Sequence, residues 1–318
     1  RLARALGGGA LGALIGEMEF WLAIVKVAAI VSMIVLGLYL VFSRPETFPM
    51  NFSNLWAHDG FFPNGVWGMM LSITVVMFSF GGIELIGITA GEAADPDRSI
   101  PRAINQVIWR ILIFYVGAMA VLMALWPWDE VGMEASPFVQ IFSNVGIPAA
   151  AHILNFVVLT AAVSVYNSAI YSNSRMLYGL AAGGDAPKIL ASLSRQGVPV
   201  VGILISSGVT LLAVLLNYLF PGQVFMLFLS IAMASVIISW GTIVITHLKF
   251  RRLYAREGRR AKFRAPFFPV VNYICLAFLV MMYALMTQIP DMQFAVLVLP
   301  VWLFVLWLGY RRKKRGIS

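Results

Sequence analysis

The sequence has little charge and a single cysteine. Of its 318 residues, 12% are charged and 60% are hydrophobic, whereas about a quarter of the residues in a soluble domain carry charge. The polar segments between its apolar runs are too short to form a water-soluble catalytic domain. This composition excludes a soluble globular protein and places the function in or at a membrane.

Residue patterns that support redox, metal or nucleotide chemistry are also missing. Cys275 lies inside an apolar run and has no second cysteine in this chain with which to form a disulfide. His58, His152 and His247 lie in separate segments without the spacing of metal ligands. A glycine-rich phosphate loop ending in Gly-Lys-Ser/Thr is absent from the sequence. We therefore predict no metal, no cofactor and no direct use of ATP.

Long apolar runs are abundant instead. A membrane-spanning helix needs about 20 mostly apolar residues. Eight runs have this character: 20–42, 66–90, 107–127, 149–171, 200–220, 223–247, 269–288 and 292–310. They lack the alternation of barrel strands and the polar faces of soluble helices. We therefore predict an all-α polytopic membrane protein with eight transmembrane helices.

The basic residues indicate how these helices are oriented. The net charge of +9 would favour nucleic acid as a partner of a soluble protein, but here Lys and Arg gather at the ends of apolar runs. Nearly all of them fall in segments on one side of the membrane; the exceptions are Lys26, Arg44, Arg110 and Arg175. The positive-inside rule then predicts that both ends of the chain are cytoplasmic. We expect lipid, and no nucleic acid, around the protein.

The second apolar run contains an unusual segment. Gly81 and Gly82 stand side by side in it, and each disfavours helix by about 1 kcal/mol relative to alanine. Unwound backbone is tolerated in a membrane only where protein or water covers it. Glu84 follows, and a carboxyl group at this depth costs several kcal/mol unless it faces the interior, is paired or is protonated. The pattern predicts a break in the helix beside a cavity. The alternative is a small-residue surface for helix packing.

Three further residues are candidates for function. Lys26 lies one and a half turns into the first run, where its side chain either extends to the cytoplasmic surface or serves inside the protein. Tyr166 and Asn167 lie in a helical pattern that continues from residue 149 to about 182. They either face a cavity or form hydrogen bonds between helices.

Residues 78–84, followed by 87–92 and Pro96, resemble the sixth transmembrane helix and the following loop of bacterial amino acid permeases of the amino acid/polyamine/organocation superfamily. Residues 16–21 with Lys26 resemble the start of the fifth helix of these permeases. Residues 164–168 and 175–178 resemble their eighth helix. The resemblance covers the chain from helix five to helix twelve.

This resemblance implies the leucine-transporter type of fold, in which two inverted five-helix repeats enclose a midplane site at two broken helices. The chain, which begins with Arg1, is then an N-terminally truncated piece: residues 1–318 are one transmembrane permease domain without its first four helices. The implied substrate-binding residues are Phe78, Ser79, Phe80, Gly81, Gly82, Glu84, Tyr166 and Asn167. The carbonyl groups of Phe78, Ser79 and Phe80 would contact the substrate ammonium, with the Phe78 ring as a lid.

The resemblance also implies how transport is driven. Lys26 would occupy the place of sodium in sodium-coupled relatives, so Lys26 and Glu84 are the candidates for proton coupling. We expect a secondary transporter of the cytoplasmic (inner) membrane that imports amino acids with protons, and not an enzyme. Four segments look most like the aromatic amino acid permeases of this group: 166–168, 171–174, 272–275 and 299–302. A permease for proline or other neutral amino acids, and a transporter-like amino acid sensor, are the alternatives.

Overall fold

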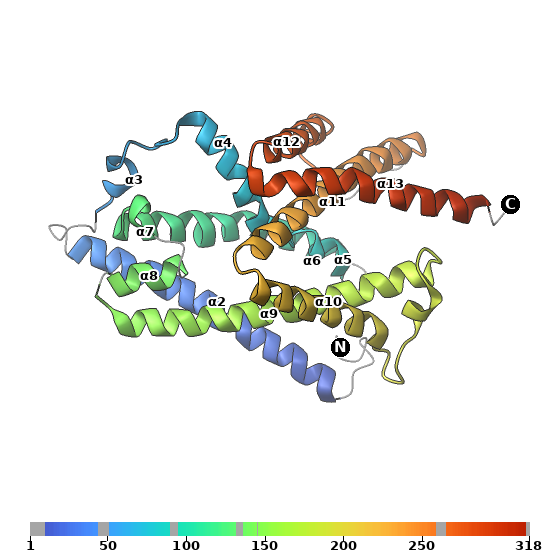
Figure 1. Cartoon of the computed structure of the whole chain (residues 1–318), viewed down its shortest axis with the longest axis horizontal. Coiled ribbons are helices and arrows are strands. Elements are labelled where there is room, and N and C mark those ends of the chain that lie inside the picture. The colour runs from blue at the N-terminus through green and yellow to red at the C-terminus, as the bar shows by residue number, and fades with distance from the viewer. Residues whose placement is uncertain are drawn as a thin grey trace. The chain divides into compact units, whose positions relative to one another are not determined.

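The computed structural model describes residues 10–43, 51–89, 95–131, 136–144, 146–258 and 265–315. Within these ranges the secondary structure is helical and contains no strand, as Figure 1 shows. The predicted all-α fold is therefore confirmed for the described residues.

Seven helical stretches of the described residues are long and apolar enough to cross a membrane. They are Phe20–Ser43, Gly65–Gly87, Arg98–Leu125, Ala151–Ala182, Val200–Leu219, Gln223–Arg256 and Pro290–Arg311. The run that we predicted at 269–288 forms a shorter apolar helix, α12 (Val270–Met286), of 17 residues. Pro269 lies directly before its first residue, a position where proline's missing N–H costs little. All eight predicted runs therefore form apolar helices, of which α12, about 25 Å long, is shorter than the other seven.

The described residues form two compact units. The first unit takes its residues from 1–63, 92–94 and 98–211, and the second unit from 64–91, 95–97 and 212–318. The helix α6 (Pro96–Arg110) belongs mostly to the first unit. The helix α10 (Val200–Leu219) begins in the first unit and ends in the second.

In the first unit, α2 (Ala10–Ser43) packs against α7 (Ala118–Leu125) and α9 (Pro148–Ala182). The apolar faces of these helices and of α8 (Pro137–Asn144) meet in one core. A π-helical segment, Ile111–Gly117, joins α6 to α7. The short helix α3 (Asn54–Ala57) also packs against α7. The observed length of α9 agrees with the helical pattern that we predicted for residues 149–182.

In the second unit, α11 (Gln223–Arg256) packs against α12 and α13 (Gln293–Arg315). The short helix Pro290–Met292 lies beside α11 and α13. The helix α4 (Gly65–Val76) packs against α12 and continues into the 3₁₀ segment Met77–Phe80, which packs against α11. Methionines fill much of this core: Met77, Met233, Met282, Met286 and Met292 are all buried. Their unbranched side chains fit irregular spaces between crossing helices.

The outer faces of the helices carry large apolar side chains. On α13, the residues from Val301 to Leu308 are each at least 39% exposed. On α10, Leu211, Leu212 and Leu215 are exposed as well. An apolar surface of this extent is unfavourable in water and favourable in lipid. The exposed faces therefore agree with a multi-pass membrane protein.

Candidate functional site

The span Gly65–Gly87 is interrupted near its C-terminal end. The α-helix ends at Val76, a 3₁₀ turn covers Met77–Phe80, a turn covers residues 81–84, and α5 (Leu85–Thr89) follows. The predicted break at the glycine pair is confirmed.

Each glycine of the pair has its own structural reason. Gly81 has φ −56° and ψ 142°, so the backbone leaves the helical conformation there. A Cβ atom on Gly81 would lie 3.1 Å from the carbonyl oxygen of Phe78. Gly82 has φ +95°, a conformation that residues with a Cβ atom rarely adopt. At Gly87 an added Cβ would meet no atom within 4 Å. The turn therefore explains the glycine pair better than helix packing does.

The turn keeps part of its backbone hydrogen-bonded. The N–H of Gly81 donates to the carbonyl oxygen of Phe78 at 3.0 Å. The N–H of Leu85 donates to the carbonyl oxygen of Gly82 at 3.1 Å. A carbonyl oxygen has two lone pairs, so that of Phe78 retains capacity for a second donor. The Phe78 ring is 44% exposed, Ser79 is exposed and Phe80 is half-buried. Of the three residues predicted to contact the substrate through their carbonyls, Phe78 and Ser79 are therefore the exposed ones.

Glu84 is the last residue of this turn. Its carboxylate oxygen Oε2 accepts the backbone N–H of Gly82 at 3.1 Å and the indole N–H of Trp240 at 3.0 Å. Trp240 lies on α11, which packs against the interrupted segment within the second unit. Our sequence analysis did not identify Trp240. A partly buried indole N–H such as that of Trp240 usually has an acceptor, but the sequence does not show which group supplies it.

Lys26 makes a specific contact in the first unit. Its side chain is half-buried, and Nζ donates to the hydroxyl oxygen of Ser164 on α9 at 2.9 Å. Ser164 is 3% exposed. The ammonium group therefore points to the neighbouring helix and not along α2 to the surface. Of the two alternatives for Lys26, this contact favours the interior one. Ser164 lies in the segment that resembles the eighth permease helix, but the sequence did not mark it as a partner of Lys26.

Tyr166 and Asn167 follow Ser164 on α9. The Tyr166 side chain is 42% exposed and Asn167 is half-buried. Asn167 is three residues after Ser164, so these two side chains lie on the same face of α9, whereas Tyr166 points in another direction. They belong to the first unit, whereas residues 78–84 belong to the second.

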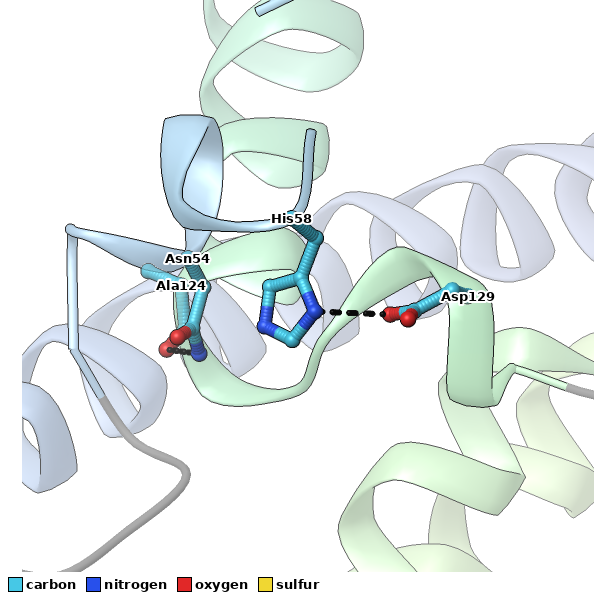
Figure 2. Close-up of polar contacts among 4 residues, drawn as sticks. All are labelled: Asn54, His58, Ala124 and Asp129. Atoms are coloured by element: carbon cyan, nitrogen blue, oxygen red, sulfur yellow. Dashed lines mark hydrogen bonds and ion pairs between the residues drawn. The ribbon is translucent and has the colours of Figure 1, made fainter. Parts of the chain in front are cut away.

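A second group of polar contacts in the first unit fastens the segment between α2 and α4 to the end of α7. The Asn54 side chain is 5% exposed, and its Nδ2 donates to the carbonyl oxygen of Ala124 at 3.2 Å. The backbone N–H of Asn51 donates to the same oxygen at 2.9 Å. His58 Nδ1 lies 3.3 Å from a carboxylate oxygen of Asp129 (Figure 2). This group contains no residue that we predicted as a site residue, and its contacts are structural.

Comparison with known proteins gives consistent matches. The family described as "Amino acid permease" matches residues 13–316. The "Aromatic amino acid transport protein AroP" of Escherichia coli (strain K12) is 50% identical over 300 residues, which are 94% of this chain and 66% of the relative. The protein of the same name from Salmonella typhi is 48% identical over 300 residues, again 94% and 66%. The "Uncharacterized amino acid permease YtnA" of Bacillus subtilis (strain 168) is 45% identical over 301 residues, 94% of this chain and 65% of the relative. The chain therefore spans about two thirds of the length of these relatives.

Proposed function

Because this chain belongs to the amino acid permease family, we propose that it forms part of a transporter that imports aromatic amino acids across the cytoplasmic membrane together with protons. Relatives about 50% identical over nearly the whole chain are named aromatic amino acid transport proteins, which supports this substrate class. The family supports transport and not catalysis as the activity. The interrupted membrane span at Gly81–Gly82, with a carboxylate in its turn, is the structural observation that carries the proposal.

In the proposed mechanism, the break binds the substrate through its backbone. Carbonyl oxygens freed from helical hydrogen bonds accept the substrate ammonium group, as in other transporters with discontinuous helices. The carbonyl of Phe78 has a lone pair available for this contact. The exposed Phe78 ring covers an apolar or aromatic side chain without adding charge. Glu84 places a negative charge beside the ammonium group.

Lys26 and Ser164 form the proposed coupling pair. An ammonium group has only donors, so in the structure Lys26 donates and the Ser164 hydroxyl accepts. After loss of a proton, the amine nitrogen accepts and the hydroxyl donates. The same pair can therefore remain hydrogen-bonded in both protonation states of Lys26. This property allows a proton to take the coupling role that sodium has in sodium-coupled transporters, without a metal ion.

The topology is part of the same proposal. The positive-inside rule places the basic segment that begins at Lys249, at the end of α11, on the cytoplasmic side, together with both ends of the chain. The two structural units belong, in this proposal, to one permease domain that also requires the preceding helices of the longer protein.

Uptake measurements test the proposal directly. The complete transporter that contains this chain is reconstituted in vesicles, and uptake of labelled phenylalanine is measured with and without an imposed proton gradient. Tryptophan, tyrosine, proline and lysine are added as competitors. We expect gradient-driven uptake that tryptophan and tyrosine block. Competition by proline alone would change the substrate class but keep the mechanism, and binding without uptake would support a sensor.

A further inference from the structure

One face of α11 lies directly on the interrupted span of the second unit. Val236 and Trp240 are four residues apart, so they project from the same side of the helix. A Cβ atom on Gly81 would lie 3.8 Å from Cγ2 of Val236. One turn further along, the indole N–H of Trp240 reaches Glu84 at 3.0 Å. This face of α11 therefore contacts the turn at both Gly81 and Glu84.

The two hydrogen bonds of Glu84 differ in range: one is local to the turn and the other links the turn to α11. The bond from the Gly82 N–H is local, since donor and acceptor are two residues apart within the same turn. The bond from Trp240 joins residues that are 156 positions apart in the chain, and it comes from a side chain anchored in a 34-residue helix. An indole N–H only donates and its ring has few rotamers, so it defines the position of the oxygen that it binds.

We propose that Trp240 is a positioning residue for substrate binding: its indole N–H holds the Glu84 carboxylate in the turn, and Glu84 in turn maintains the geometry of the Gly81–Gly82 break. This inference rests on the proposed function of the break as the substrate site. Trp240 itself acts through Glu84 and needs no contact with substrate.

The test separates the indole N–H from the bulk of the ring. Trp240→Phe removes the donor and part of the ring, and incorporation of 3-benzothienylalanine at position 240 replaces the N–H by sulfur at nearly constant shape. Because a hydrogen bond to a charged group is lost, we expect both changes to raise KM for uptake about tenfold and to leave the maximal rate nearly unchanged. Trp302→Phe is the matched control, because Trp302 is 57% exposed on α13 in the same unit. It should leave KM unchanged.

A spectroscopic readout tests the contact independently of transport. The ultraviolet resonance Raman difference between the wild type and Trp240→Phe isolates the Trp240 signal, whose N–H-sensitive band reports hydrogen bonding. We expect the band of a bonded indole, and a shift toward a free indole in Glu84→Ala. A wild-type KM in the benzothienylalanine protein, or an unshifted band in Glu84→Ala, would overturn the inference. Failure of the wild type to transport any aromatic amino acid would instead refute the proposed function, and the Raman band would still report the contact.

Discussion

The interrupted span of the second unit and the continuous helix α9 of the first unit place polar groups among apolar residues in different ways. In α9, 35 residues remain helical and only side chains supply polar atoms, as Ser164 does for Lys26. Between α4 and α5, the helix stops and the backbone itself becomes accessible at Gly81 and Gly82. A continuous helix suits a single defined partner such as a lysine, whereas an open turn offers several carbonyl and amide groups to a bound molecule.

The largest effect is expected where the backbone conformation itself is changed. Gly82→Ala places a Cβ atom on a residue with φ +95°, which costs about 1–2 kcal/mol. We expect uptake to fall at least about tenfold, because the break either closes or shifts. Gly87→Ala is the control, since its Cβ would meet no atom within 4 Å and its backbone is helical. Equal uptake by the two variants, at equal amounts in the membrane, would show that the unwound turn is not required.

The second largest effect is expected from removing the negative charge of Glu84 in the turn. Glu84→Gln retains an oxygen that can accept the N–H groups of Gly82 and Trp240 but removes the negative charge. We expect about tenfold weaker uptake with normal insertion, because the substrate ammonium loses its charged neighbour. Uptake is measured per inserted molecule by labelled phenylalanine and immunoblotting. Normal uptake by a well-inserted variant would contradict a role of Glu84 in the site.

The side-chain pair of the continuous helix should affect coupling and not binding. Lys26→Met keeps an unbranched chain and removes the ammonium donor to Ser164. We expect gradient-driven accumulation to be lost while exchange of labelled for unlabelled substrate continues at a rate close to that of the wild type. Counterflow and accumulation in the same vesicles distinguish the two activities. Unchanged accumulation would favour the alternative in which Lys26 only extends to the membrane surface.

The same comparison shows what the sequence could predict. The break was predictable, because adjacent glycines and a carboxyl in an apolar run are local features of the chain. The helices were predictable from apolar runs, including α12, whose 17 residues lie inside the predicted run 269–288. The partners of the polar groups were not predictable: Lys26 and Ser164 are 138 positions apart, and Glu84 and Trp240 are 156 apart. Such pairs depend on how helices pack, which apolar periodicity does not encode.

The smallest effects are expected in the segment between α2 and α4, where Asn54 contacts the end of α7 (Figure 2). Asn54→Ala removes one donor to the Ala124 carbonyl, which still accepts the N–H of Asn51. We expect a loss of about 1 kcal/mol in stability and little change in KM. Thermal unfolding of the purified protein measures the first quantity, and uptake measures the second.

Asp129→Asn is the milder change in the same place. The side chain of Asp129 is 45% exposed and its carboxylate lies 3.3 Å from His58, and an exposed polar contact of this kind contributes at most about 1 kcal/mol. We therefore expect a smaller loss of stability than for Asn54→Ala, measured by thermal unfolding of the purified protein. If Asp129→Asn destabilised the protein more than Asn54→Ala, the His58–Asp129 contact and not the buried amide would hold this segment. The order of the two variants thus identifies which contact fastens the connection between the α2 span and the interrupted span.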